Sequence, residues 1–161
     1  MPTFTRSVST RADRLRGVDP RGQRLAAAFT SVVLTLALLC TAMPGVAATL
    51  LAAQALMFAT GVVAGPGRTP YAFVFRAFVR PRIGPPAELE PTEPPRFAQA
   101  VGLAFAVVGL AGYASGLVVL GAVATTFALV AALLNATIGL CLGCEAYLLV
   151  RRAVPRVREA H

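Results

Sequence analysis

Two cysteines lie three residues apart near the end of a long apolar stretch, in the segment Cys141-Leu-Gly-Cys144. Thiols at this spacing can exchange electrons by opening and closing a disulfide, or can carry sulfur as a persulfide. The same two residues can also serve as small apolar side chains in a membrane helix. The residues alone leave thiol redox or sulfur handling and a purely structural role both open.

The residues around the pair bear on its reactivity. If one continuous helix runs through the segment, a rotation of about 100° per residue puts both cysteines on one face with an acid and arginines. A nearby arginine favours the reactive thiolate, whereas Glu145 and the negative end of a helix disfavour it. Glu145 and Arg151 are therefore expected to tune the pKa of the thiols. The candidate thiol site comprises Cys141, Cys144 and Glu145, supported by Asn135, Gly139, Gly143 and Arg151.

The two thiols are expected to play different roles. About 20 residues of helix cross a bilayer, so a span that starts near Leu117 reaches the membrane boundary before the cysteines. Cys144 then lies closer to solvent and is expected to exchange with a partner, while Cys141 resolves the mixed disulfide. A thioredoxin-type pair sits at the N-terminus of a helix, which is the opposite arrangement, but Gly139 and Gly143 can break the helix and reset this geometry.

Other chemistry has little support in the sequence. Zinc needs four protein ligands in a structural site, and the only histidine is His161 at the end of the chain. The third cysteine, Cys40, falls toward the far end of the first apolar stretch. We therefore predict neither a metal nor a cofactor.

The composition indicates a membrane protein. The chain is 57% hydrophobic and 14% charged, whereas ordinary soluble domains are about 25% charged. Residues 25–67 and 97–144 carry no charged side chain, and each stretch is long enough for two spans. The net charge of +8 comes from arginines and is assigned to membrane topology and anionic lipid. No aromatic and basic β pattern indicates a nucleic-acid partner.

These stretches predict an all-α fold, a bundle of four transmembrane helices arranged as two hairpins. The spans cover about residues 25–42, 46–65, 97–112 and 117–150 within a membrane domain at 19–152. A mobile, arginine-rich N-terminus precedes it at 1–18, and a tail follows at 153–161. Small residues on the spans permit close helix contacts within the bundle or between subunits of an oligomer.

The arginines predict the orientation. The two short turns between paired spans carry no charge, and every arginine lies before the first span, in the loop at 66–96 or in the segment Arg151–Arg158. Basic residues of short loops stay on the cytoplasmic side. We therefore expect a multi-pass protein of the plasma membrane with both termini and the long loop in the cytoplasm.

The loop at 66–96 begins with alternating aromatic and basic residues. Aromatic rings at the headgroup level and arginines toward an anionic inner leaflet are typical of a segment that lies on the membrane surface. The residues assigned to this interfacial segment are Tyr71, Phe75, Arg76, Phe78, Arg80 and Arg82. The following "GPPAELEPTEPPR" is rich in proline and predicts a stiff, extended linker.

The two halves of the chain share a pattern. "RLAAAFTSVV" from Arg24 resembles "RFAQAVGLAF" from Arg96, each an arginine before an alanine-spaced span. Such a start is common in membrane helices and does not by itself establish a duplication. Within the spans, Gln54 and Asn135 are the side chains expected to make hydrogen bonds between helices.

Several segments together resemble a known family. "VDPRGQR", "FRAFVRPRIGPPAELEPTEPPRFAQAVG" and "NATIGLCLGCEAYLL" resemble the domain-of-unknown-function 4395 family of actinobacterial integral membrane proteins. The family has no assigned activity. The resemblance implies a genomic association with thioredoxin-like and rhodanese-like proteins, and therefore a partner of one of those kinds.

Two functions from different classes remain open. The first is a membrane-bound thiol protein that passes electrons or sulfur through a cytoplasm-facing Cys141 and Cys144. The second is a non-enzymatic scaffold or small permeation subunit in which the cysteines are structural and Gln54 and Asn135 line a helix contact. Reactivity of the thiols toward alkylating reagents distinguishes them.

Overall fold

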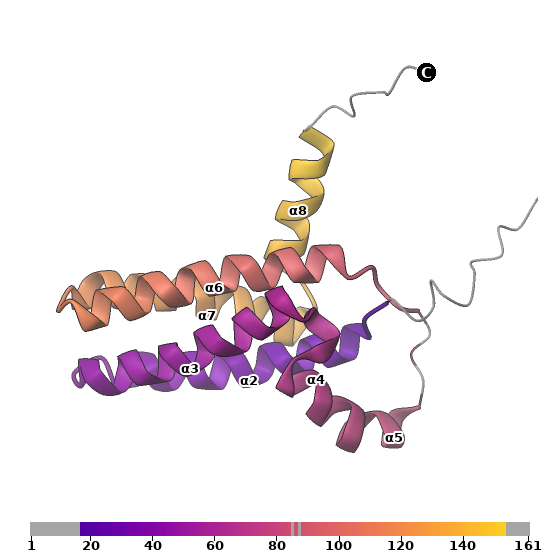
Figure 1. Cartoon of the computed structure of the whole chain (residues 1–161), viewed down its shortest axis with the longest axis horizontal. Coiled ribbons are helices and arrows are strands. Elements are labelled where there is room, and N and C mark those ends of the chain that lie inside the picture. The colour runs from indigo at the N-terminus through magenta and orange to yellow at the C-terminus, as the bar shows by residue number, and fades with distance from the viewer. Residues whose placement is uncertain (1–16, 85, 87, 154–161) are drawn as a thin grey trace, which may run out of the picture.

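The computed structural model of the chain describes residues 17–84, 86 and 88–153. Four of its helices are long and apolar enough to cross a membrane. They are α2 (Pro20–Leu39), α3 (Pro44–Val63), α6 (Glu93–Ala114) and α7 (Val118–Ile138), and they lie alongside one another as a bundle (Figure 1). The predicted all-α bundle of two hairpins is confirmed. The expected mobile N-terminus, except for residues 17 and 18, and the tail beyond 153 lie outside the described residues.

Three of the spans, α2, α3 and α6, begin earlier than the hydropathy alone indicates, because their first turns carry polar or proline residues. Asp19 caps α2 by accepting the backbone N–H of Arg21 at 3.0 Å. Pro20 occupies the first position of the helix, where no N–H is needed. Prolines also stand in the first turns of α3 and α6. The first helix of each hairpin, α2 or α6, therefore begins at a proline-containing turn.

The fourth span ends well before the expected limit near residue 150. Gly139 adopts a left-handed conformation with φ of 75°, and its N–H donates to the carbonyl of Asn135 at 3.1 Å. The N–H of Leu140 reaches back to Leu134 at 3.3 Å and closes the helix. The chain then starts a new helix, α8 (Leu142–Ala153), so the cysteines do not continue the span.

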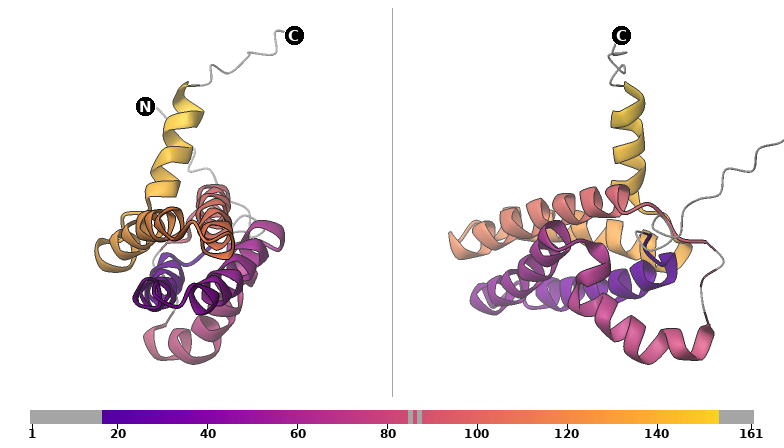
Figure 2. Two further views of the ribbon diagram at one scale, coloured as in Figure 1. Left: turned by 90° about the vertical axis from the view of Figure 1, so that its left-hand side faces the viewer. Right: turned by 45° about the vertical axis from the view of Figure 1, so that its right-hand side comes forward.

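Helix α8 lies crosswise to the spans and reaches out from the end of the bundle (Figures 1 and 2). At about 100° per residue, Leu142, Ala146 and Leu149 share one side of this helix, Arg151 lies opposite them, and Arg152 lies about 80° from Leu142. A helix that is apolar on one side and basic on the other suits the boundary between lipid and water. With 12 residues, α8 is not among the helices long enough to cross a membrane.

Small residues let the helices approach closely in the core. A methyl group at Gly112 of α6 would lie 2.5 Å from the backbone nitrogen of Gly121 in α7. Gln54 is 1% exposed and joins neighbouring elements, because its amide donates to Thr30 at 3.1 Å and accepts the Tyr71 hydroxyl at 3.3 Å. Gln54 thus makes the hydrogen bond between helices that its position predicted.

The two arginines that begin the similar segments occupy equivalent places. Arg24 of α2 donates to the carbonyl of Thr137, near the end of α7, at 2.7 Å. Arg96 of α6 donates to the carbonyl of Val62, near the end of α3, at 2.6 Å. Each arginine therefore caps the last turn of a neighbouring helix from the other hairpin, α2 beside α7 and α6 beside α3. This shared geometry supports a two-fold relation between the hairpins.

Replacing either arginine with alanine should lower the free energy of unfolding by about 1 kcal/mol, because charged hydrogen bonds to helix carbonyls are lost. Thermal unfolding in detergent measures the effect. Arg68→Ala is the matched control, since it removes one exposed cation from the same end of the bundle and leaves both caps intact. Equal losses in Arg24→Ala, Arg96→Ala and Arg68→Ala would contradict a capping role.

Candidate functional site

Cys141 lies in the short connection between α7 and α8 and stands directly before the first residue of α8. The backbone N–H of Cys144 donates to the sulfur of Cys141 at 3.4 Å. The two thiols are free and partly buried. The expected placement at the C-terminal end of a helix is therefore wrong for Cys141, because Gly139 ends the span and lets Cys141 stand at the N-terminus of the next helix.

Gly143 holds this turn against the bundle. A methyl group at Gly143 would lie 2.6 Å from both the Cα and the Cβ of Ala98 in α6. Position 143 must therefore be glycine for α8 to start so close to α6. This contact fixes the thiol pair to the rigid bundle, because it ties the first turn of α8 to a membrane span.

The two thiols have opposite acidities. A hydrogen bond from the Cys144 thiol lowers the pKa of Cys141 to about 7, and the backbone N–H groups of Cys144 and Gly143 act in the same direction. The pKa of Cys144 is raised, first because its proton is held by Cys141 and then because the thiol is partly buried. Where the pair carries a negative charge near neutral pH, that charge therefore lies on Cys141.

An acidic residue from the proline-rich linker lies near the pair. Val18 and Glu90 form an antiparallel bridge, with N–H to O distances of 2.9 and 3.0 Å, and Gln23 donates to the Glu90 carboxylate at 3.3 Å. The charge of Glu90 raises the pKa of both thiols as a smaller effect. The linker is thus pinned to the start of α2, and its carboxylate faces the thiol region.

A groove with a volume of about 340 Å³ opens beside the thiols. Cys141, Cys144 and Glu145 line one side of it, and Glu90 with the linker prolines lines another. The structure therefore brings the three residues of the candidate thiol site together around one groove.

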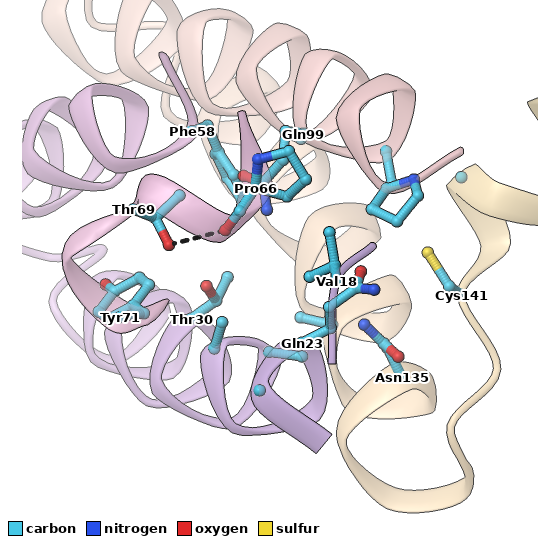
Figure 3. A pocket seen from close by; sticks show the side chains of 18 of the residues that line it. Val18, Gln23, Thr30, Phe58, Pro66, Thr69, Tyr71, Gln99, Asn135 and Cys141 are labelled. Carbon is cyan, nitrogen blue, oxygen red and sulfur yellow. Dashed lines mark hydrogen bonds between the residues drawn. The ribbon is translucent and has the colours of Figure 1, made fainter. Parts of the chain in front are cut away.

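A larger cavity of about 710 Å³ lies between the spans and also reaches Cys141. Figure 3 shows Thr30 and Tyr71 on one wall, Phe58, Gln99 and Pro66 on another, and Asn135 and Cys141 at a further side. Asn135 lines both this cavity and the groove. Cys141 is therefore accessible from two directions, toward the groove and toward the space between the membrane helices.

The predicted supporting residues do not all serve the thiols. Gly139 and Asn135 end α7 and set the position of the pair, as described above. Arg151 instead lies over the ring of Tyr147, 5.8 Å from its centroid, and Tyr147 packs against Phe97 with 5.7 Å between ring centroids. Arg151 is held by this aromatic contact, so the acidity of the thiols comes from hydrogen bonds rather than from an arginine.

The interfacial segment forms the short helices α4 (Pro70–Val74), η2 (Phe75–Val79) and α5 (Arg80–Ile83). Tyr71 stacks on Phe29 with 5.6 Å between centroids, and Phe75 is 3% exposed and packs against Gly22. Both rings contact residues of α2, and Phe75 is buried there because Gly22 leaves room for its ring. Phe78 is exposed, and Arg76, Arg80 and Arg82 are exposed as well.

Cys40 and the acidic residues form no metal-binding group in the described part of the chain. Cys40 stands at the C-terminal cap of α2, beside the turn that leads into α3 and at the opposite end of the bundle from Cys141. Within residues 17–84, 86 and 88–153, no group of three or more His, Cys, Asp or Glu side chains is placed to hold a metal ion.

Sequence reasoning did not place Glu90 or Ala98 beside the thiols. Glu90 lies 51 positions before Cys141 in the chain and reaches it only through pairing with Val18. Ala98 contacts Gly143 through packing of α8 on α6. The glycine between the two cysteines was the signal available, since glycine marks a close approach of two backbones.

The comparisons with known proteins give one result. A family model described as "Domain of unknown function (DUF4395)" matches residues 18–152, most of the chain. No curated protein and no solved structure matches it. The matched range contains the four spans, the linker and both cysteines of the groove.

Proposed function

We propose a thiol–disulfide exchange function for this chain, which belongs to the DUF4395 family of unknown function. Its four apolar helices indicate a multi-pass membrane protein. The observation that carries the proposal is the position of Cys141 at the N-terminus of α8, where it accepts the backbone N–H of Cys144 at 3.4 Å. A thiolate held in this way is the reactive form of cysteine at neutral pH.

The pKa values of the two thiols favour Cys141 as the thiol that exchanges with the partner and Cys144 as the resolving thiol. The sequence alone predicted the opposite assignment. Cys141, whose pKa is lowered to about 7, attacks a disulfide of the partner. A bond forms between Cys141 and one partner sulfur, and the other partner sulfur leaves as a thiolate. Cys144 then gives up its proton and attacks Cys141, which closes the internal disulfide and releases the second partner thiol. The chain is oxidised by two electrons and the partner disulfide is reduced to a dithiol.

The same steps run backwards when the partner arrives reduced. A partner thiolate attacks Cys141 in the disulfide, Cys144 leaves and takes up a proton, and the second partner thiol then releases Cys141. A soluble protein with a dithiol, of the thioredoxin-like kind, fits this chemistry. A rhodanese-like partner would instead hand over a single sulfur atom to Cys141 as a persulfide.

The arginine distribution supports a cytoplasmic location of the thiol groove. The described arginines belong to the first turns of α2 and α6, to the segment between α3 and α6, and to α8, all at the same end of the bundle as the thiols. Basic residues beside spans remain in the cytoplasm. The partner is therefore a cytoplasmic protein, and the lipid near α8 is the anionic inner leaflet.

The aromatic disulfide dithiobis(nitrobenzoate) tests the exchange in a Cys40→Ser background. We expect the parent protein to release two coloured thiolates per chain and to end with a Cys141–Cys144 disulfide. Cys144→Ser should release one thiolate and retain the reagent on Cys141, because no resolving thiol remains. Cys141→Ser should react more slowly than Cys144→Ser, because burial and the charges of Glu90 and Glu145 still raise the pKa of Cys144 after its contact with Cys141 is lost.

Equal rates in the two single variants would eliminate the assigned order of attack. Complete inertness of both thiols in folded protein, with full reaction after unfolding, would favour the alternative function of a non-enzymatic scaffold or permeation subunit with structural cysteines. Reaction of the unfolded chain is the control that shows the reagent is active.

A further inference from the structure

We propose that the 710 Å³ cavity between the spans binds a membrane quinone that accepts electrons from Cys141 and Cys144. This inference rests on the proposed thiol function and names the electron acceptor. A thiol pair that is reduced by a partner needs an oxidant to complete a cycle. The cavity places a site for such a molecule beside Cys141, inside the apolar region of the bundle.

The position of the cavity favours a ligand that comes from the membrane. Residues from α2, α3, α6 and α7 line it, together with the segment after α3 and the start of α8. Cys141 lies at its border, and Figure 3 shows the sulfur of Cys141 directed from the connecting segment toward the interior. Its volume falls within the range of about 300–1,000 Å³ that small-molecule sites occupy.

The walls suit a flat, uncharged ring. Phe58, Phe105 and Phe127 provide aromatic surface, and alanines of α2 and α7 provide flat apolar walls. Aromatic side chains pack well on planar rings. The charged residues of the lining, Asp19, Arg76 and Arg80, come from the start of α2 and from η2 and α5 rather than from the middle of the spans. A neutral molecule is therefore favoured over a charged one in the interior.

Two amides can bind the carbonyl oxygens of a quinone. The side chains of Gln99 and Asn135 line the cavity, and the hydrogen bonds among the described residues use neither of them. Each offers N–H groups as donors. Gln54 differs, because Thr30 and Tyr71 already satisfy its amide. A quinone has two carbonyl oxygens on opposite sides of its ring, which matches two separate donors.

The redox step balances within these groups and solvent. The Cys141 thiolate and the Cys144 thiol form one S–S bond, which releases two electrons and the proton of Cys144, and solvent supplies the second proton. The quinone takes them up as two O–H bonds on its former carbonyl oxygens and leaves as a quinol. A reduced cytoplasmic dithiol then reopens the disulfide, so electrons flow from the partner to the membrane quinone pool.

The test uses decylubiquinone and the full-length protein in lipid nanodiscs. The ring of this probe is fully substituted, so a thiol cannot displace a ring hydrogen. We expect reduced protein to convert the quinone to quinol, followed by absorbance, with one Cys141–Cys144 disulfide formed for each quinol. Ala131→Phe fills the cavity from α7 and should slow the reaction at least tenfold.

Ala53→Phe is the matched control, because it adds the same bulk to the exposed side of α3. Its rate should equal that of the parent protein. Gln99→Leu is a second variant that adds no bulk, and loss of its donor should raise the KM for quinone about five- to tenfold. If Ala131→Phe and Gln99→Leu both reduce the quinone as fast as the parent protein, the inference is overturned.

Binding is measured separately in the Cys141→Ser/Cys144→Ser variant, which cannot turn over. Added decylubiquinone should raise its thermal midpoint, and Ala131→Phe should abolish this shift. If decylubiquinone leaves the thermal midpoint unchanged and an added phospholipid raises it, the inference is overturned and the cavity is assigned to an acyl chain. If dithiobis(nitrobenzoate) still gives the expected exchange while quinone neither binds nor reacts, the inference fails and the proposed thiol function stands.

Discussion

Replacing Cys144 with alanine should slow alkylation of Cys141 at pH 7 by about tenfold. The Cys144 thiol provides the largest effect that lowers the pKa of Cys141 to about 7, from an ordinary value of 9.0. Without it, the pKa of Cys141 rises and less thiolate is present at neutral pH. The intrinsic nucleophilicity of the thiolate rises with its pKa, which offsets part of the loss and keeps the expected change near tenfold.

The measurement is the rate of iodoacetamide labelling of Cys141 between pH 5 and 10, in a Cys40→Ser background. The parent curve should have its midpoint near pH 7, and the Cys144→Ala curve should move to higher pH. Cys144→Ser keeps a hydroxyl donor at the same place and should fall between them. Curves that coincide for the parent and Cys144→Ala would show that Cys144 does not set the acidity of Cys141.

Replacing Gly112 with alanine should destabilise the bundle by about 1–3 kcal/mol. The added methyl would lie 2.5 Å from the backbone nitrogen of Gly121, and both positions belong to helices that pack along each other. The atom in the way is backbone, so the two helices must separate rather than a side chain rotate. Contacts across the α6–α7 pair, including those of the buried Tyr113, would weaken together.

Thermal or SDS-induced unfolding in micelles measures this loss. Gly45→Ala is the matched control, because a methyl group there meets no atom within 4 Å and Gly45 lies in the first turn of α3. It should be neutral or slightly stabilising, since alanine favours helix more than glycine does. A loss of stability in Gly45→Ala as large as that in Gly112→Ala would contradict the close approach of α6 and α7.

The sequence predicted the membrane helices because the energetic effects are large and local. Residues 25–67 and 97–144 carry no charge, and burying charged groups in lipid is expensive. Asp19 and Pro20 likewise predicted the start of α2 through local hydrogen bonding and backbone geometry. The similar segments at Arg24 and Arg96 indicated a repeat, but their capping of α7 and α3 is visible only once the helices are packed.

The thiol site shows the limit of such reasoning. Gly139 was recognised as a residue able to break the last helix, but hydropathy does not reveal whether the break forms, because residues on both sides are apolar. The position of Cys141 at the start of a helix depends on that break, and there the sulfur meets first the Cys144 thiol and then the backbone N–H of Cys144, which both lower its pKa. Phe75 was likewise assigned to the membrane surface and instead fills the space beside Gly22.

The sequence by itself therefore determined that this protein has four membrane helices, where its arginines cluster and that two thiols lie three residues apart. Composition and local periodicity are enough for these features, because the bilayer imposes them on any chain. Only the tertiary structure decided which thiol carries the charge and what surrounds it. Glu90, Ala98 and the cavity walls reach Cys141 through packing between segments far apart in the chain, and such contacts leave no local pattern in the sequence.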